Sequence, residues 1–386
     1  MKKIKFAVIT STRAEYGILY PLISAMIKED SFETQVIVTG THLLSKYGNT
    51  ISCIEADEIP ISYKVPIMSN DKNESCDVIS AGIKAFHTIF EKEMYDAIIL
   101  LGDRYELFAF AVPAVMHRIP IIHIHGGEKT KGAMDEKIRH AITKMSSVHF
   151  ASTQENANRI VQMGEQPTLV FTVGALGIDN IMSMEPEPKD KLSEELGLSF
   201  DIPTALVTFH PVTMDTVEDI KKQAKEVFSA LNESGIQCIV TMPNSDIGGD
   251  EVLKIIMNYV EEFPDKFYFF KNLGSKRYIS TMHYVSMLVG NTSSGIIEAP
   301  SFNIATVNIG DRQEGRFAPE TVINCKCNKR DILNSIELAL SDEFKSKIKE
   351  FENPYGDGHA TEKMINILKE ISWNDDELFK KEFFDN

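Results

Sequence analysis

The chain has 386 residues, of which 43% are hydrophobic and 25% are charged, which is the composition of an ordinary globular protein. One hydrophobic core rarely extends over that length, so we expect two domains. The formal net charge of −16 argues against a nucleic acid or an anionic membrane as partner, because both would repel the protein at long range.

The same composition gives expectations about compartment and metal content. The apolar run near the N-terminus is too short for a signal peptide, and no uncharged run approaches the length of a membrane span. We therefore expect a cytoplasmic protein. The five cysteines are scattered, and the pair at 325 and 327 has the wrong spacing for a zinc site. We expect reduced thiols and no metal.

The N-terminal half alternates predicted strands with predicted helices. Short apolar, β-branched runs are typical of buried strands, and apolar residues at helical spacing indicate the helices between them. Strands are expected at 4–10, 35–39, 97–101, 119–124, 148–151 and 168–173, and helices across 19–26, at 78–91, from 105, at 135–144 and near 157–163. This alternation predicts a parallel sheet with helices on both faces.

A second alternation follows residues 182–191, where two prolines and alternating charges are typical of a linker. Its strands are expected at 204–209, 236–242, 267–270, 287–290 and 304–309. The predicted fold class is α/β, with two Rossmann-like domains facing a cleft. We place the first domain at 1–178 and the second at 179–386. The last helix, around 361–371, either completes the second domain or crosses back to the first.

Candidate acid/base residues follow the strands of the first domain, where chemistry concentrates in open α/β sheets. Asp103 is a general base or a stabiliser of oxocarbenium-like charge, with Arg104 on a phosphate; alternatively, the two form a structural pair that caps the next helix. Glu128 follows two glycines that let a ligand approach closely, or lies exposed on a loop. Asp135 is a catalytic carboxylate or an acidic residue favoured in a first helical turn, and Arg139 can pair with it in either case.

Candidate phosphate ligands occur in both halves. No Gly-x-Gly-x-x-Gly follows the first strand, which argues against NAD, FAD and a P-loop. Arg13 stands where that strand meets a helix, so it contacts a phosphate or forms a surface salt bridge. In the second half His210 ends a strand, where it is either a ligand contact or a structural histidine, and Arg312 follows a later strand.

The run Gly290-Asn-Thr-Ser-Ser-Gly-Ile-Ile-Glu298 joins a predicted strand to a helix. The hydroxyls of Thr292, Ser293 and Ser294, with free backbone N–H groups, suit a diphosphate at a helix N-terminus. Glu298 is placed to accept hydrogen bonds from a ribose. An ordinary Ser/Thr helix cap explains only part of this run.

Nine motifs in order give the chain a resemblance to a known family. They are TSTRAEYG, TGTHLLSKYGNT, LGDRYE, HIHGGE, DEKIRHAITKMS, HPVT, GNTSSGIIE, NIGDRQEGR and YGDGHA. The sequence resembles the hydrolysing UDP-N-acetylglucosamine 2-epimerases of sialic-acid-type biosynthesis. The resemblance implies a GT-B fold and elimination of UDP to give a glycal. Hydration of the glycal then yields N-acetylmannosamine.

The resemblance also implies roles for individual residues. Asp103 and Asp135 match the family's catalytic acids, and His210 stabilises the departing diphosphate. The positions that match UDP contacts are Arg13, Arg104, His210, Thr292, Ser293, Glu298 and Arg312. Many relatives read His-Ile-Glu-Gly-Gly-Glu where this chain has His125 in place of the central carboxylate, and one extra residue separates Glu128 from Asp135. Either His125 or Glu128 is then the missing acid/base.

Three alternatives to this reaction remain open from the sequence. The substrate can be UDP-N,N'-diacetylbacillosamine of the legionaminic-acid branch, which lacks the 6-hydroxyl and carries a 4-acetamido group. The chain can be a GT-B glycosyltransferase, or a two-lobed sugar-binding protein without catalysis. In every case we expect a UDP-sugar ligand, no cofactor, and a homo-oligomer, either a dimer or a tetramer.

Overall fold

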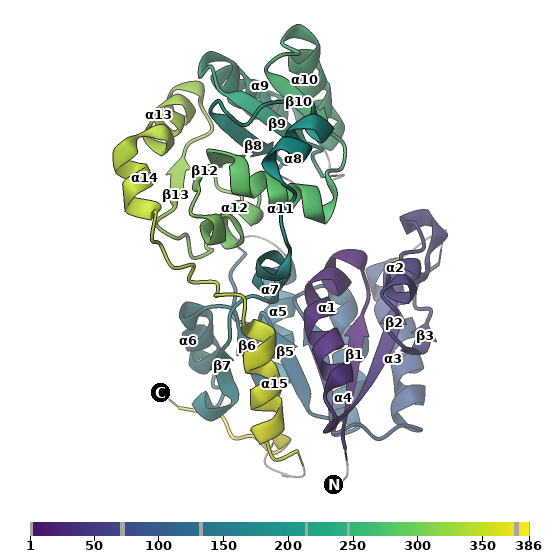
Figure 1. Ribbon diagram of the computed structural model, residues 1–386. Coiled ribbons are helices and arrows are strands. Elements are labelled where there is room, and N and C mark those ends of the chain that lie inside the picture. Colours follow the sequence, from purple (N-terminus) through teal and green to yellow (C-terminus); the bar gives the residue numbers. More distant parts are fainter. Residues whose placement is uncertain are drawn as a thin grey trace. The chain divides into compact units, whose positions relative to one another are not determined.

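A computed structural model describes residues 3–69, 74–130, 134–212, 215–244, 248–373 and 378–385. The chain divides into two compact units, one made of Met1–Asn180 with Tyr355–Asn386 and the other of Ile181–Pro354. Figure 1 shows both units, and each is described by itself below.

Within the described residues, the first unit contains a parallel sheet of seven strands in the order β3-β2-β1-β4-β5-β6-β7. The strands are β1 (Ile4–Thr10), β2 (Phe32–Thr39), β3 (Ile61–Val65), β4 (Ala97–Leu101), β5 (Ile121–Ile124), β6 (Val148–Ala151) and β7 (Val170–Thr172). The helices are α1 (Arg13–Lys28), α2 (Ile51–Ala56), α3 (Ser75–Phe90), α4 (Phe108–Met116), α5 (Met134–Met145), α6 (Gln154–Gln162) and α15 (Ala360–Glu370). The helix α7 (Leu176–Ser183) contains the boundary between the two units.

Two hydrophobic clusters cover the two faces of this sheet. One joins β1 and β4 to α1 and α15, with Leu19 and Met364 fully buried. The other joins the same strands to α3, α4 and α5, with Phe86 and Ile142 fully buried. All five side chains of β4 are buried, as expected for a central strand that is packed on both faces.

The register of the sheet brings the candidate residues to one edge. Leu101 of β4 pairs with Ile124 of β5, which pairs with Phe150 of β6. Because these strands are parallel, the segments after β4, β5 and β6 leave the sheet at the same edge. Asp103 and His125 therefore emerge side by side.

The described part of the second unit contains a parallel sheet of six strands in the order β10-β9-β8-β11-β12-β13. The strands are β8 (Thr204–Thr208), β9 (Gln237–Thr241), β10 (Phe267–Phe270), β11 (Met287–Gly290), β12 (Ala305–Ile309) and β13 (Val322–Cys325). The helices are α8 (Lys189–Leu196), α9 (Val217–Glu233), α10 (Gly249–Glu262), α11 (Gly274–Tyr284), α12 (Ser294–Ile297), α13 (Lys329–Leu340) and α14 (Asp342–Ile348). The apolar stripes of α9, α10 and α13 bury one face of this sheet.

The predicted class of two parallel α/β domains is confirmed, and several details differ from the expectations. The edge strands β3 and β13 and the helices α2, α7 and α8 were not predicted, and α8 begins within the run 182–191 that was expected to be a linker. The last part of the chain, from Tyr355 on, belongs to the first unit, where α15 packs on α1 (Figure 1). Among the described residues, every helix is too short or too polar to span a bilayer.

Candidate active site

The first sheet reverses its strand order between β1 and β4. Such a switch point leaves a crevice beyond the carboxyl ends of the two strands, where ligands of open α/β sheets bind. Thr12 caps α1 by accepting a hydrogen bond from the Glu15 N–H at 3.3 Å. Arg13 is the first residue of α1 and has an exposed side chain. Asp103 and Arg104 follow β4, so they lie at the same switch point as Arg13.

Two buried glutamates hold residues at this switch point by hydrogen bonds, and the sequence analysis did not identify either of them. Glu15 accepts hydrogen bonds from the N–H and the hydroxyl of Ser11, at 3.0 and 2.8 Å, and burial raises its pKa to about 7. Glu106 is fully buried and pairs with Arg104, whose Nη2 lies 2.5 Å from Oε1. The alternative in which Arg104 pairs with Asp103 therefore does not hold, because Arg104 pairs with Glu106. The Thr-x-x-Glu capping pattern at 12–15 was the available signal for Glu15.

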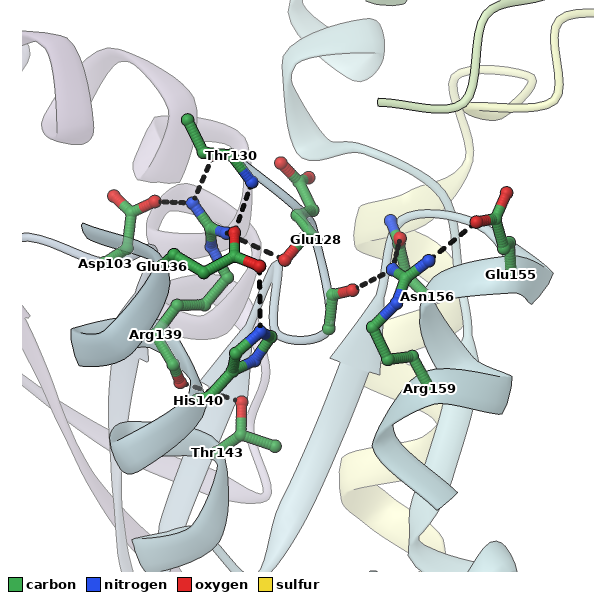
Figure 2. A network of polar contacts seen from close by, with 11 residues as sticks. Asp103, Glu128, Thr130, Glu136, Arg139, His140, Thr143, Glu155, Asn156 and Arg159 are labelled. Carbon is green, nitrogen blue, oxygen red and sulfur yellow. Dashed lines mark hydrogen bonds and ion pairs between the residues drawn. The ribbon is translucent and has the colours of Figure 1, made fainter. Parts of the chain in front are cut away.

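Arg139 of α5 links most of the candidate acid/base region (Figure 2). Its side chain is 2% exposed and forms an ion pair with Asp103. The same guanidinium donates to the carbonyl of Glu128 at 2.7 Å and to the hydroxyl of Thr130 at 2.9 Å, and it lies 3.4 Å from Glu136. A buried cation with these partners fixes the end of β4 and the segment 128–130 to one helix.

The turn that carries His125 and Glu128 has a constrained backbone. His125 has a φ of +63° and Gly127 a φ of +75°. A Cβ on Gly127 would lie 2.3 Å from the carbonyl oxygen of Asn156, so only glycine fits there. Glu128 Oε1 accepts a hydrogen bond from the Ser152 hydroxyl at 3.1 Å. Glu128 is therefore a positioned carboxylate, and the alternative of an exposed loop residue does not hold.

His123 connects β4 to α5 from inside the sheet. Its Nε2 lies 2.8 Å from the carbonyl oxygen of Gly102, and its Nδ1 lies 3.2 Å from the Thr143 hydroxyl. Burial lowers the pKa of His123 to about 3, so the ring is neutral and donates from Nε2. This contact holds the residue that precedes Asp103.

Adjacent acidic residues of α5 have different environments. Asp135 is exposed; partial desolvation and then the charge of Asp103 raise its pKa. Glu136 accepts a hydrogen bond from the Thr130 N–H and lies against Arg139. Although burial acts in the opposite direction, the hydrogen bond from Thr130 helps to hold the pKa of Glu136 below its usual value. The structure thus joins Glu136, which the sequence interpretation passed over, to the ion-pair network around Asp103.

In the second unit the strand order reverses between β8 and β11. There the His210 N–H donates to Asn291 Oδ1 and the Asn291 amide donates back to the His210 carbonyl, both at 2.8 Å. The Nδ1 of His210 accepts from the Asn244 N–H at 3.1 Å. In a neutral ring the proton therefore lies on Nε2, which makes Nε2 a hydrogen-bond donor.

The polar run after β11 has a tighter backbone than expected. A Cβ on Gly290 would lie 1.9 Å from the carbonyl oxygen of Thr208, so the strand ends pack closely there. Thr292, Ser293 and Ser294 are half-buried. The N–H groups of Ser294, Gly295 and Ile296 already donate within the run, and α12 is only four residues long. The expected row of free backbone donors is therefore short, and the hydroxyls of Thr292 and Ser293 become the main groups available to a ligand.

Glu298 and Arg312 are both held by neighbours in this unit. The Ser294 hydroxyl donates to Glu298 and in turn accepts from the Tyr278 hydroxyl at 3.0 Å. Burial raises the pKa of Glu298. Arg312 donates from Nη1 to the Asn291 carbonyl at 3.0 Å, so the site candidates His210 and Arg312 contact the same asparagine.

These observations define a class of protein: a two-domain α/β enzyme with ionisable and hydroxyl side chains at the switch point of each sheet. The family can be named as well. The sequence model for UDP-N-acetylglucosamine 2-epimerase matches residues 24–369. The chain belongs to this family, which confirms the resemblance seen in its motifs.

Individual relatives agree with this assignment. The chain is 37% identical to the polysialic acid biosynthesis protein P7 of Escherichia coli, over 100% of this chain and 98% of that protein. It is 36% identical to the hydrolysing UDP-N,N'-diacetylbacillosamine 2-epimerase of Legionella pneumophila, over 95% of this chain and 96% of that protein. The fold matches a UDP-N-acetylglucosamine 2-epimerase from Neisseria meningitidis bound to UDP-GlcNAc with a TM-score of 0.81 and 19% identity, over 95% of this chain and 100% of that structure.

Proposed function

We propose that the protein converts UDP-N-acetylglucosamine to N-acetylmannosamine and UDP. In the first step the C2 proton is removed and the C1–O bond to UDP breaks, which leaves a glycal with a C1–C2 double bond. In the second step water supplies the oxygen at C1, and a proton is added to C2 on the opposite face. Family membership supports this class of reaction, and the buried Arg139 that holds Asp103, Glu136 and the Glu128 backbone is the observation that carries it.

The first unit supplies the acid/base candidates. Elimination needs a base for the C2 proton and negative charge near C1, where positive charge develops as the bond to UDP breaks. We assign these tasks to Asp103, His125, Glu128 and Asp135, and we add Glu136 because it shares the guanidinium of Arg139 with Asp103. Hydration of the glycal needs the same groups in the opposite protonation states.

The second unit supplies candidate ligands for UDP. His210 donates from Nε2 and Arg312 carries a fixed positive charge, so both suit the charge that develops on the departing diphosphate. Glu298 is assigned to the ribose hydroxyls. The hydroxyls of Thr292 and Ser293 are assigned to the diphosphate, and Ser294 holds Glu298. Arg13 and Arg104 of the first unit are kept as candidate phosphate ligands.

A second UDP-sugar, UDP-N,N'-diacetylbacillosamine, is an alternative substrate. The Legionella relative is named for UDP-N,N'-diacetylbacillosamine, and the Escherichia coli relative for polysialic acid biosynthesis. N-acetylglucosamine and N,N'-diacetylbacillosamine differ at C4 and C6, away from the bond that reacts. The cytoplasmic location and the homo-oligomer expected from the sequence remain predictions.

The test is a comparison of kcat/KM for the two UDP-sugars with the purified protein, with UDP and the free sugar both quantified. We expect UDP and N-acetylmannosamine in equal amounts from UDP-N-acetylglucosamine. A kcat/KM at least tenfold higher for UDP-N,N'-diacetylbacillosamine would replace the assigned substrate. UDP release that requires an added acceptor would favour a glycosyltransferase, and binding without turnover of either sugar would remove the proposed activity.

A further inference from the structure

Arg159 of α6 contacts the turn that carries Glu128 from the side opposite Arg139 (Figure 2). Its side chain is 14% exposed. Nη1 donates to the carbonyl of Gly127 and to Asn156 Oδ1, the latter at 3.0 Å. Nη2 donates outward to Glu155 at 2.6 Å. One edge of the guanidinium therefore faces the turn and the other faces an exposed carboxylate.

A second route leads from the same guanidinium to the Glu128 side chain. Asn156 accepts from Arg159, and its amide donates to the Ser152 hydroxyl at 2.9 Å. Ser152 donates to Glu128 Oε1 at 3.1 Å. All three bonds donate in the same direction and end on the carboxylate, so each bond polarises the next.

The two arginines together hold successive carbonyl groups of the turn. Arg159 binds the carbonyl of Gly127 and Arg139 binds that of Glu128. The positive φ at Gly127 and its close approach to Asn156 leave this backbone little room to adjust. Loss of the Arg159 contact therefore releases one side of the turn while Asp103 stays paired with Arg139.

We propose that Arg159, acting through Gly127 and through the Asn156–Ser152 chain, is the positioning residue that sets the place of Glu128 in the epimerisation. This inference rests on the proposed function and adds a residue outside its acid/base and UDP-binding groups. Arg159 contacts no reacting atom in this account, so its effect falls on the chemical step and not on binding of UDP.

The experiment compares Arg159→Ala with the matched control Glu155→Gln, which removes only the charge of the outward partner of the same guanidinium. Displacement of a catalytic group by about 1 Å costs about 100-fold in rate. For Arg159→Ala we expect kcat to fall about 100-fold, with KM for the UDP-sugar and Kd for UDP within about twofold of the wild type. Added guanidinium should restore kcat at least tenfold. Glu155→Gln should keep wild-type values.

Several outcomes decide against the inference. They are a wild-type kcat in Arg159→Ala, an equal loss of kcat and UDP affinity, or no response to guanidinium. If Arg159→Ala does not fold, Ser152→Ala breaks the side-chain route at its last bond, the one to Glu128; a lowered kcat with unchanged Kd for UDP supports the inference, and a wild-type kcat overturns the proposed Asn156–Ser152 route. A wild-type protein without turnover would remove the proposed function itself, whereas a fully active Arg159→Ala enzyme would remove this inference alone.

Discussion

Replacing Arg139 with Met tests whether one buried guanidinium holds the candidate acid/base groups together. Met keeps an apolar stem but removes every donor, so Asp103 and Glu136 lose their cation and the carbonyl of Glu128 loses its donor. Removing one partner of a buried ion pair costs about 3–5 kcal/mol. The Asp103 side chain is 30% exposed, so water compensates part of this, and we expect about 3 kcal/mol. In a protein of 386 residues that loss lowers Tm by about 4 °C.

Thermal unfolding of the full chain measures this effect, with Lys137→Met as the matched control. Lys137 is an exposed residue of the same helix, and its replacement should change stability by less than about 0.5 kcal/mol. The double variant Asp103→Asn with Arg139→Met should lose less stability than the sum of the single variants, because the orphaned carboxylate is gone. An Arg139→Met protein that melts with the wild type, or a strictly additive double variant, would refute the reasoning.

Three further predictions follow from the same structure. Asp103→Asn and His125→Ala should each lower kcat by about 10²- to 10⁴-fold with unchanged UDP affinity by calorimetry; a near-normal rate in His125→Ala would move the acid/base role to Glu128. The raised pKa of Glu15 favours the folded state while the carboxyl is neutral, so this stability is present below about pH 4.5 and is lost as pH rises to about 7. Relative to Glu15→Gln, the wild type should lose about 3 kcal/mol across that window in urea unfolding, and parallel pH profiles would contradict this. Lys381→Met removes an ammonium that donates to the carbonyls of Lys144 and Ser146, at the C-terminal end of α5, and to the buried Glu165. We expect the free energy of unfolding to fall by about 2 kcal/mol in the same assay, and no change would show that the C-terminal segment does not stabilise this helix.

Much of the fold could be predicted because its central strands are continuous apolar runs. β1, β4 and β8 are each bounded by polar turns, and their burial on both faces leaves a clear signal in the sequence. The strand β3 (Ile61–Val65) lies at a sheet edge, and its exposed side chains alternate with partly buried ones. Such an edge strand has too few apolar residues to stand out from a loop.

The candidate site was predictable in its location and less so in its pairings. Strand ends indicated where Asp103 and Glu128 would lie. The pairing of Asp103 with Arg139 joins residues 36 positions apart, which local spacing cannot reveal. Asp135 and Glu136 are neighbours on a helix and point about 100° apart, so the sequence could not show which of them faces the arginine.

The most direct test of the proposed reaction is isotope incorporation during turnover in deuterated water. Elimination breaks the C2–H bond and hydration forms it again from solvent, so each N-acetylmannosamine released with UDP should carry one deuterium at C2 by mass spectrometry and NMR. N-acetylmannosamine that retains the original C2 hydrogen would contradict the account.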